Sequence, residues 1–527
     1  MRRVTAEQCA SAAAAACAAF VVLCAVSVPT TAAVNVLAIE PLPARSHWTF
    51  MRAVVTAMAT GGHNVTAYTP FASSSSAAAT AGVCDGAPVG CGYAEVPLRL
   101  GVPDKVAMDV RTAVADFADQ WRFVGIAVDK SRTACDRLDR MAATGSFAGV
   151  RYDMVVVELV SSECTSRVSA ALGDHVPLVY VFPSPMASWV EAKALGTGPG
   201  PSYAARLFAR YAAPDTFARR LENVYGWTVM AALQWFHERG DDQTAYRKPA
   251  VTFVNTDPVV EKPVPAVQNM IGIGGVHLPP LEPISPDILK FIEESQNGVI
   301  YFSFGTVVAL SSLPDHIQNA FKDALAEVPQ RVLLKFEGEM KDKPKNVMTS
   351  KWLPQRDILK HPNVKLFIGH GGISGVYEAV DAGVPILGFP LFYDQPRNMA
   401  NLVDAGMALS LDLFSVTKNT LLKAINEIIN NETYSKNAKI VSDRFKDRPM
   451  SPTESVVYWT EYVIRYKNAP HLKSHAFNLT WYQYFLLDVI AVVFLIILFV
   501  SYITLKTLRL VNKIIFKPLS KSKLKPD

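Results

Sequence analysis

The chain has few of the residues that mark metal-binding or disulfide-rich proteins. Only seven of its 527 residues are cysteines, and three of these lie within the first 33 residues. The other four, Cys84, Cys91, Cys135 and Cys164, have no spacing typical of a zinc site. No Asp-x-Asp motif stands at the end of a predicted strand. The sequence therefore predicts no metal ion.

The body of the chain also has no surplus of charge of one sign. The formal net charge is +5, but the last 22 residues hold seven basic groups and one acidic group, and the first 33 hold two and one. This leaves 43 lysines and arginines against 45 aspartates and glutamates. A nucleic-acid interface needs a concentrated positive field, so nucleic acid is not expected as a partner. The length suffices for two domains with full cores.

Residues 1–33 are typical of a secretory signal peptide. Arg2 and Arg3 precede an apolar stretch at Ala12–Val28, and Thr31-Ala32-Ala33 offers small residues for cleavage. An uncleaved N-terminal anchor is the alternative, and the weak hydrophobicity of the alanine-rich stretch disfavours it.

A second apolar run, residues 485–505, predicts a transmembrane helix. At 1.5 Å per residue, about 21 helical residues cross the hydrocarbon core of a bilayer. Trp481 and Tyr482 precede the run like an interfacial belt, and the basic tail 506–527 follows it. The positive-inside rule then predicts a single-pass type I protein with a lumenal body and a cytoplasmic tail. A buried core helix is the alternative, which the length and the flanks disfavour.

Short signals indicate the compartment. Lys523–Asp527 fits the dilysine pattern that retrieves membrane proteins to the endoplasmic reticulum, although a basic tail can contain this pattern by chance. In an oxidising lumen, the two cysteines that flank residues 85–90 could form a bridge across a Gly/Pro-rich loop. Asn431 and Asn478 begin glycosylation sequons, whereas Asn64 begins a sequon within a predicted strand and is expected to be buried.

The body divides into two halves, and each alternates buried strands with helices as a doubly wound α/β domain does. The first half, 34–255, opens with a strand, a loop at Pro41–His47 and a helix to Thr60. A proline-rich linker, 256–296, leads to the second half, 297–450, and a return segment, 451–484, follows. Buried strands are expected at Val34–Glu40, Asp153–Leu159, Leu178–Phe182, 298–305, Arg331–Phe336, Val364–Ile368 and Pro385–Phe389. Two such domains that face one another place a ligand crevice at the carboxyl ends of both sheets.

Two parts of the first half are less regular. Ser73–Ala94 is rich in Ser, Ala and Gly and is expected to be a surface loop. Residues 202–240 are predicted to be helical and hold aromatic residues such as Tyr225, Trp227 and Trp235. These suit core packing or the wall of an acceptor pocket, and core packing is favoured.

The stretch Lys351–Met399 has the strongest functional signal in the chain. A predicted strand ends before the turn His370-Gly371-Gly372, and a helix is expected from Ile373. The N–H groups at the start of that helix favour an anion, to which His370 can also donate. Ser303, at the end of another strand, adds a hydroxyl group. These groups suit a diphosphate.

Other side chains of the region suit the rest of a nucleotide sugar. Trp352 offers a plane for a base, and Gln355 offers an amide for its edge. Glu378, on the helix after the glycines, suits the two hydroxyl donors of a ribose. Asp394 and Gln395 follow the next strand, where they can bind sugar hydroxyls. Each residue alone has a structural explanation, but their combination at strand-to-helix corners predicts a nucleotide-sugar site.

The region resembles the signature of the UDP-glycosyltransferase family, especially the animal membrane-bound UDP-glucosyl- and UDP-glucuronosyltransferases and, among them, the insect members. The matching pieces are Trp352-x-Pro354-Gln355, His361-Pro362, His370-Gly371-Gly372, Glu378, Gly383-Val384-Pro385, Pro390, Asp394-Gln395 and Asn398. Phe445–Pro449 and Tyr458–Tyr462 also resemble the family's return segment. The resemblance implies the GT-B fold of two facing Rossmann-like domains. It also implies inverting transfer of a sugar from UDP to an acceptor.

The resemblance implies a role for each side chain: uracil is held by Trp352 and Gln355, ribose by Glu378, the diphosphate by Ser303, His370 and Gly372, and the sugar by Asp394 and Gln395. With no metal predicted, the diphosphate-binding groups would also neutralise the leaving group. The family commonly has Thr before His-Gly-Gly and Asn after the following Ile. This chain has Gly369 and Ser374 there, so one hydroxyl is lost near the phosphates, and Ser374 takes the place of Asn in the donor site. A Gln at position 395 resembles the glucose-using members.

The catalytic base is expected in the first half. His47 suits this role because an imidazole with a pKa near neutrality can remove the proton of an acceptor hydroxyl, and the family's base is a His in this loop. A packed loop histidine is the alternative. A carboxylate should orient the imidazole, and the resemblance places it directly after the strand that begins at Asp153, where this chain has Glu158. Glu163 is the second candidate.

These features predict an enzyme of the endoplasmic reticulum membrane that moves glucose from UDP-glucose to a small lipophilic alcohol, phenol or carboxylic acid, as in detoxification. UDP-glucose would be a co-substrate, and no permanently bound cofactor is expected. One alternative is the same fold with UDP-glucuronate, UDP-galactose or UDP-N-acetylglucosamine as donor. A non-catalytic protein that binds a UDP-sugar or small molecule, or more remotely a membrane adaptor, is another. The sequence leaves open the acceptor and whether the chain forms a homo-oligomer.

Overall fold

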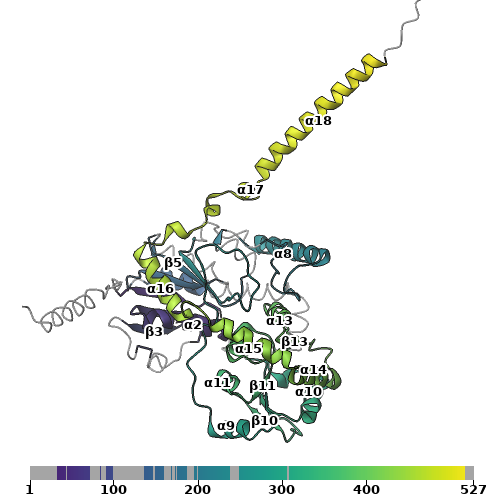
Figure 1. Ribbon diagram of the computed structural model, residues 1–527. Helices are drawn as coiled ribbons and strands as arrows, with labels where there is room; N and C mark the ends of the chain where they lie inside the picture. Colours follow the sequence, from purple (N-terminus) through teal and green to yellow (C-terminus); the bar gives the residue numbers. More distant parts are fainter. Residues whose placement is uncertain are drawn as a thin grey trace, which may run out of the picture. The chain divides into compact units, whose positions relative to one another are not determined.

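The computed structural model describes residues 33–516, apart from residue 43 and the segments 72–82, 85–90, 99–135, 146, 148, 160–167, 169–171, 174, 187–194, 197, 199, 238–247 and 306–307. Outside the described residues lie the predicted signal peptide up to residue 32, Cys135, Cys164, Glu163 and the dilysine pattern. The chain forms two compact units, Met1–Lys473 and Ser474–Asp527 (Figure 1).

The first unit begins with a sheet of seven parallel strands in the order β3-β2-β1-β4-β5-β6-β7. The winding direction reverses between the central strands β1 and β4, because β2 and β3 lie on one side of β1 and the later strands on the other. The strands are β1 Asn35–Ile39, β2 Asn64–Thr69, β3 Gly92–Pro97, β4 Met154–Glu158, β5 Leu178–Phe182, β6 Val251–Val254 and β7 Met270–Gly272. β4, β5 and β6 are buried over their whole length, as expected of a parallel sheet covered on both faces.

The second sheet has six parallel strands in the order β10-β9-β8-β11-β12-β13, and it reverses direction between β8 and β11. Its strands are β8 Val299–Ser303, β9 Arg331–Lys335, β10 Val347–Ser350, β11 Val364–Gly369, β12 Ile386–Gly388 and β13 Ala408–Ser410. The helices around the second sheet are α9 Pro286–Glu293, α10 Asp315–Glu327, α11 Gln355–Lys360, α12 Ile373–Ala382, α13 Gln395–Asp404, α14 Lys418–Asn430 and α15 Glu432–Lys446. A short 3-10 turn, Leu310–Ser312, precedes α10.

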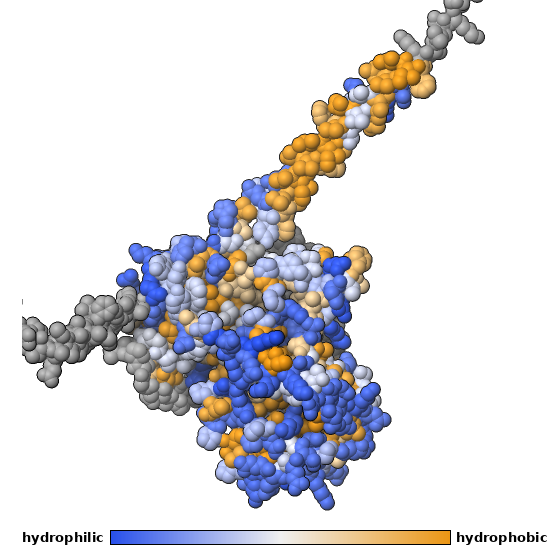
Figure 2. Space-filling view, viewed as in Figure 1, coloured by the Kyte–Doolittle hydropathy of each residue, from blue (hydrophilic) through white to orange (hydrophobic). Residues whose placement is uncertain are grey.

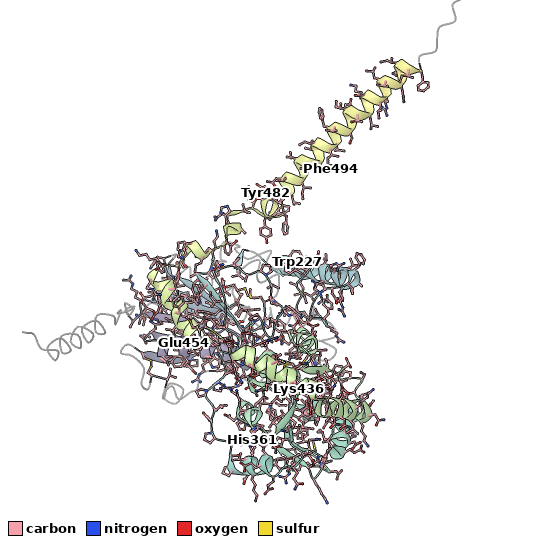
Figure 3. The ribbon with its side chains drawn as sticks, viewed as in Figure 1. Trp227, His361, Lys436, Glu454, Tyr482 and Phe494 are labelled. Atoms are coloured by element: carbon pink, nitrogen blue, oxygen red, sulfur yellow. A yellow bond between two sulfur atoms is a disulfide. The ribbon has the colours of Figure 1, made fainter. Side chains whose placement is uncertain are left out.

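Helix α2, Arg45–Thr60, covers one face of the first sheet. Its buried side chains, such as Phe50 and Val54, share a hydrophobic cluster with Val36 of β1. The return helix α16, Pro452–Arg465, packs into the same cluster through Val456 and Val463. A capping box between Ser451 and Glu454 begins α16, and Figure 3 labels Glu454 there. The chain thus returns from the second sheet to stabilise the first.

Several predicted boundaries differ from the structure. β7 lies inside the predicted linker 256–296, so the first domain extends beyond residue 255. β3 begins inside the predicted loop Ser73–Ala94. α2 begins at Arg45, so His47 belongs to the first helical turn and not to the loop. Each of these segments is short or lies at an element end, where periodicity carries the weakest signal.

Two predictions of burial are wrong. Helix α8, Phe217–His237, exposes 67% of Tyr225, although Trp227 is half-buried. Core packing therefore does not hold for Tyr225. Asn64 is exposed because it is the first residue of β2, where its side chain donates a hydrogen bond to Asn35 Oδ1 at 2.9 Å.

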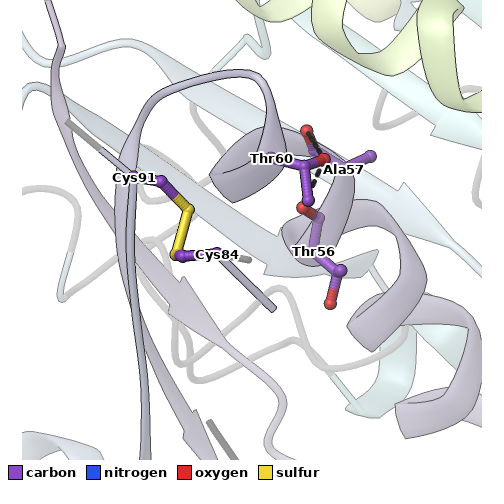
Figure 4. Close-up of a disulfide and its surroundings, with 5 residues drawn as sticks. All are labelled: Thr56, Ala57, Thr60, Cys84 and Cys91. Atoms are coloured by element: carbon purple, nitrogen blue, oxygen red, sulfur yellow. Dashed lines mark hydrogen bonds between the residues drawn. A yellow bond between two sulfur atoms is a disulfide. The ribbon is translucent and has the colours of Figure 1, made fainter. Parts of the chain in front are cut away.

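Cys84 and Cys91 form the disulfide that the sequence allowed (Figure 4). The bridge closes the connection that leads into β3 near the end of α2. In the last turn of α2, Thr60 Oγ1 donates to the carbonyls of Thr56 and Ala57, both at 3.1 Å.

The second unit contains the candidate membrane segment. Helix α18, Leu487–Ile515, follows the short helix α17, Trp481–Tyr484, and two 3-10 turns, of which His475–Asn478 belongs to this unit and Pro470–Leu472 ends the first. α18 is long and apolar enough to cross a bilayer, and Figure 2 shows its apolar surface over most of its length. Figure 3 labels Phe494 on α18 and Tyr482 on α17. The observed helix begins two residues after the predicted span and continues ten residues beyond it.

Candidate active site

Four of the predicted site residues lie where the winding direction of the two sheets reverses. In the first sheet, β1 leads towards His47 and β4 ends at Glu158. In the second sheet, β8 ends at Ser303 and β11 leads into His370. A doubly wound sheet opens a crevice at such a point, because the loops that leave two neighbouring strands turn to opposite faces.

His47 and Glu158 lie close together although 110 residues of sequence separate them. Nδ1 of His47 is 3.5 Å from Oε1 of Glu158, and the two side chains are 21% and 0% exposed. The contact is close enough for the carboxylate to attract a protonated imidazole, but it does not have hydrogen-bond geometry. Because Nδ1 is buried, Nε2 is the nitrogen that can meet an acceptor.

His370, shortly before α12, fits between Gly305, which follows β8, and Gly372, which precedes α12. A Cβ on Gly305 would stand 2.8 Å from its Cε1, and a Cβ on Gly372 would stand 2.5 Å from its Nε2. Burial, assisted by the charge of Lys335, lowers the pKa of His370 to about 4. The ring is therefore neutral near pH 7 and has one N–H to donate. Ser303, in the neighbouring strand, is 2% exposed, and its Oγ accepts from the Gly305 N–H at 3.2 Å.

Gln355 and Glu378 form a hydrogen-bonded pair beside Trp352. Glu378 Oε2 accepts from Gln355 Nε2, and Gln355 Oε1 accepts from the Tyr301 hydroxyl at 3.2 Å. Burial raises the pKa of Glu378 to about 7, although the hydrogen bond from Gln355 acts in the opposite direction. Trp352 is 71% exposed, so one of the largest apolar faces of this region is open to a ligand.

Asp394 and Gln395 are buried at the start of α13, where they also hold their own loop. Gln395 Oε1 accepts from the N–H groups of Leu391 and Phe392 at 2.9 and 3.3 Å. Asn398 Nδ2 donates to Asp394 Oδ2 at 2.7 Å. Burial raises the pKa of Asp394, while the bond from Asn398 and the charge of His47 oppose it.

Direct contacts join the halves around Asp394. The hydroxyl groups of Tyr393 and Ser184 are 3.1 Å apart, and the Tyr393 carbonyl accepts from the Phe208 N–H at 3.0 Å. Tyr393 and Phe208 both have positive φ angles, 58° and 68°. Such angles are strained for bulky residues and cluster at functional sites. On the other side of the junction, the Ser374 carbonyl lies 3.3 Å from His277 Nε2.

Arg397, two residues after Gln395, forms a second junction between the halves. Its Nη1 donates to the carbonyls of Met186 and Ala205 at 3.3 and 3.0 Å, and its Nη2 is 3.2 Å from Glu261 Oε2. The arginine side chain is 7% exposed, so this is a buried ion pair.

The sequence analysis missed several residues of the site, among them Tyr301, Lys335 and Arg397. Tyr301 is the middle residue of β8, whereas Lys335 is the last residue of β9 and donates to the Gly305 carbonyl. A lysine that ends a buried strand on the edge facing the crevice could have been found by the rule that located Ser303.

Two parallel doubly wound sheets with polar groups gathered at both reversal points define a GT-B glycosyltransferase fold. Among solved structures, a glycotransferase of kitacinnamycin is similar with a TM-score of 0.55 at 16% identity, over 82% of this chain and 98% of that chain. Glycosyltransferase VinC, solved in complex with DTDP, is similar with a TM-score of 0.54 at 16% identity, over 82% and 100%.

Comparison of sequences narrows this class to one family. Residues 35–522 match the family described as UDP-glucoronosyl and UDP-glucosyl transferase. UDP-glucosyltransferase 2 of Dactylopius coccus is 34% identical over 91% of this chain and 93% of its own length. UDP-glucuronosyltransferase 2B17 of Mus musculus is 42% identical over 44% of each chain. The chain therefore belongs to the UDP-glucoronosyl and UDP-glucosyl transferase family and is a UDP-glycosyltransferase, which confirms the resemblance.

Proposed function

We propose that the chain transfers glucose from UDP-glucose to a small lipophilic acceptor with a hydroxyl or carboxyl group, with inversion at the anomeric carbon. The observation that carries the proposal is the contact between His47 and Glu158 at the reversal point of the first sheet, with Asp394 across the junction. In this proposal His47 and Glu158 are catalytic, and Ser303, Trp352, Gln355, His370, Gly372, Ser374, Glu378, Asp394 and Gln395 bind the donor.

The proposed reaction is a single displacement. Nε2 of His47 takes the proton of the acceptor hydroxyl while the acceptor oxygen forms a bond to the anomeric carbon. The bond from that carbon to the diphosphate oxygen breaks, and UDP leaves with the electron pair. Glu158 stabilises the imidazolium. The neutral N–H of His370 and the N–H groups at the start of α12 stabilise the negative charge on the diphosphate. UDP-glucose is thus a co-substrate, and no permanently bound cofactor takes part.

The charges around Asp394 favour a neutral sugar over glucuronate. Asp394 and Glu158 would both repel a sugar carboxylate, and the buried guanidinium of Arg397 is already bound to Glu261. Gln395, whose Oε1 is engaged by its own loop, has its amide NH2 to offer a sugar hydroxyl. The family includes both glucosyl- and glucuronosyltransferases, so UDP-glucuronate is the second candidate donor.

The apolar helix α18 supports a location in a membrane. We place the protein in the endoplasmic reticulum as a single-pass type I protein, because a signal-like N-terminus precedes the body and a basic tail follows α18. Cys84–Cys91 and the exposed sequon residues Asn431 and Asn478 fit a lumenal body. An anchored enzyme meets lipophilic acceptors where they partition, which fits a role in detoxification.

The test compares wild type with His47→Ala on membranes supplied with UDP-glucose and a panel of phenols, alcohols and carboxylic acids. UDP release and glycoside formation should fall at least about 100-fold in the variant, since general base catalysis contributes that much. Ser46→Ala, an exposed neighbour, is the matched control. Equal UDP release by wild type and His47→Ala would refute the catalytic role. Competition between UDP-glucose and UDP-glucuronate, in wild type and Gln395→Glu, tests the donor.

A further inference from the structure

Glu40, at the end of β1, is a buried carboxyl group that the proposed mechanism does not use. It is 0% exposed, like Glu158. Its N–H donates to the Tyr68 carbonyl at 2.9 Å, so the ladder between β1 and β2 continues through Glu40. Its Oε1 accepts from the Leu42 N–H at 3.1 Å. Its Oε2 has no hydrogen-bond partner among the described residues.

The register of the strands places Glu40 beside Glu158 on one face of the sheet. Ile39 pairs with Tyr68 and with Val157, so the next position in the row brings Glu40 between Thr69 and Glu158. Side chains alternate along a strand. Two residues before each carboxyl group, Ala38 and Val156 pack into the cluster that contains the buried face of α2. Both carboxyl groups therefore point to the side of the sheet from which His47 approaches.

Each element that packs around Glu40 contributes a polar or titratable side chain. β2 contributes Thr69, whose Oγ1 accepts from the Phe71 N–H. β4 contributes Glu158, and α2 contributes His47, which is 3.5 Å from Glu158. Across the junction, Tyr393 and Asp394 interact electrostatically with Glu158 and His47, respectively. Among the described residues, no lysine or arginine forms an ion pair with Glu40 or Glu158.

Two buried carboxyl groups without a cation between them do not both ionise readily, because burial and mutual repulsion oppose the second charge. Burial raises the pKa of Glu40 well above its usual range, and the charge of Glu158 raises it further, while the bond from Leu42 acts in the opposite direction. A carboxylic acid beside a carboxylate can donate its O–H to it. Both oxygens of Glu158 lack a hydrogen-bond partner among the described residues, so they can accept.

We infer that Glu40 is a positioning residue of the active site, which shares one proton with Glu158 so that the buried pair presents a single negative charge to His47. The inference rests on the proposed function of His47 as catalytic base. Donation from Glu40 stabilises the carboxylate of Glu158. It thereby favours the state in which Glu158 is charged and His47 is neutral and ready to accept a proton.

The kinetic test measures kcat/KM against pH for the full chain in membranes, with Glu40→Leu and Glu40→Gln. Loss of the donor destabilises the charged Glu158, so the acid limb of Glu40→Leu should move to higher pH by about one unit, a tenfold change in proton affinity. Glu40→Gln has an N–H that can replace the donor, so its acid limb should stay near that of wild type. A purely structural Glu40 would change thermal stability without moving this limb. An unmoved limb in Glu40→Leu would overturn the inference.

The thermal test does not depend on catalysis. The folded protein keeps the proton of Glu40 at pH values where the unfolded chain releases it, so the stability of wild type falls as pH rises above about 4.3. Glu40→Gln lacks this proton, so the Tm of this variant should increase relative to that of wild type as pH rises between pH 5 and pH 8. A difference in Tm that is constant over this range would overturn the inference. If wild type transfers no sugar, the proposed function fails, and the thermal test still decides whether Glu40 holds a proton in the folded protein.

Discussion

Binding of UDP-glucose should depend on the protonation of Glu378. Burial raises the pKa of this carboxyl group to about 7 in the free protein, so about half of the molecules hold it uncharged at pH 7. A ribose presents two O–H donors, which prefer the charged carboxylate as acceptor. Binding should therefore lower the pKa of Glu378 and release its proton. Affinity for UDP-glucose should therefore rise with pH and level off about one unit above the pKa of Glu378, near pH 8.

The size of the effect follows from the fraction of charged Glu378. If the neutral form does not bind, the apparent Kd is multiplied by one plus the ratio of neutral to charged protein. Each pH unit below about 7 then weakens binding by about tenfold. Relative to pH 8, affinity should fall by about twofold at pH 7 and by about tenfold at pH 6. His370, whose pKa is lowered to about 4, remains neutral throughout and adds no slope.

The assay is calorimetric titration of the full chain in detergent micelles with UDP-glucose, from pH 5.5 to pH 8.5. UDP-glucose is preferable to UDP, because a phosphate monoester has its own ionisation near pH 6. Glu378→Gln is the matched control: its side-chain carbonyl can still accept from Gln355, but it does not titrate. The control should bind with little pH dependence. A flat wild-type profile, or the same slope in Glu378→Gln, would refute the reasoning.

Two further substitutions separate binding from stability. Trp352→Ala removes a side chain that is 71% exposed, so it should change the free energy of unfolding by less than about 0.5 kcal/mol while UDP-glucose affinity falls by about tenfold, since stacking on a base contributes about 1–3 kcal/mol. Calorimetry and thermal unfolding measure both, and a large loss of stability would mean that Trp352 is a structural residue. Arg397→Met should destabilise the chain by about 3–5 kcal/mol, because it leaves the carboxylate of Glu261 buried without a cation, with a hydrogen bond from Asn401 Nδ2 at 3.4 Å as its remaining contact. The double variant Glu261→Gln/Arg397→Met should recover much of that loss in denaturant unfolding. If it recovers none, the bonds from Arg397 to the Met186 and Ala205 carbonyls matter more than the charge pair.

The sequence predicted the strongly apolar strands of both sheets, including the three-residue β12, and missed β3, β6, β7, β10 and β13. β8 and β11 are apolar runs that precede turns of small residues, and both lie where the sequence predicted them. β7 and β13 have three residues each, and β7 follows a proline-rich stretch. A three-residue strand has no periodicity to detect, and its pairing comes from the neighbouring strand.

The residues proposed to bind the donor could be selected from the sequence, because all of them except Ser303 stand within one contiguous stretch. Trp352, Gln355, His370 and Glu378 all follow turns or helix starts whose spacing is visible in the sequence. The contacts among these side chains could not be predicted from the sequence. Gln355 was expected to meet a base, and in the free protein it donates to Glu378 and accepts from Tyr301. These contacts cannot be predicted from the sequence, because they depend on which side chains the fold brings within reach of one another.

The proposed catalytic residues show a different limit of prediction from the sequence. His47 and Glu158 come together only because β1 and β4 are neighbours in the sheet, although they are far apart in the sequence. Once this adjacency is known, strand alternation also brings Glu40 to the same face, since it follows Ala38 by two positions as Glu158 follows Val156. The sequence alone presents Glu40 only as the last residue of a predicted strand, before Pro41. A carboxyl group at the carboxyl end of a central parallel strand instead lies next to the proposed catalytic pair, so in this proposal its protonation is part of the chemistry of the site.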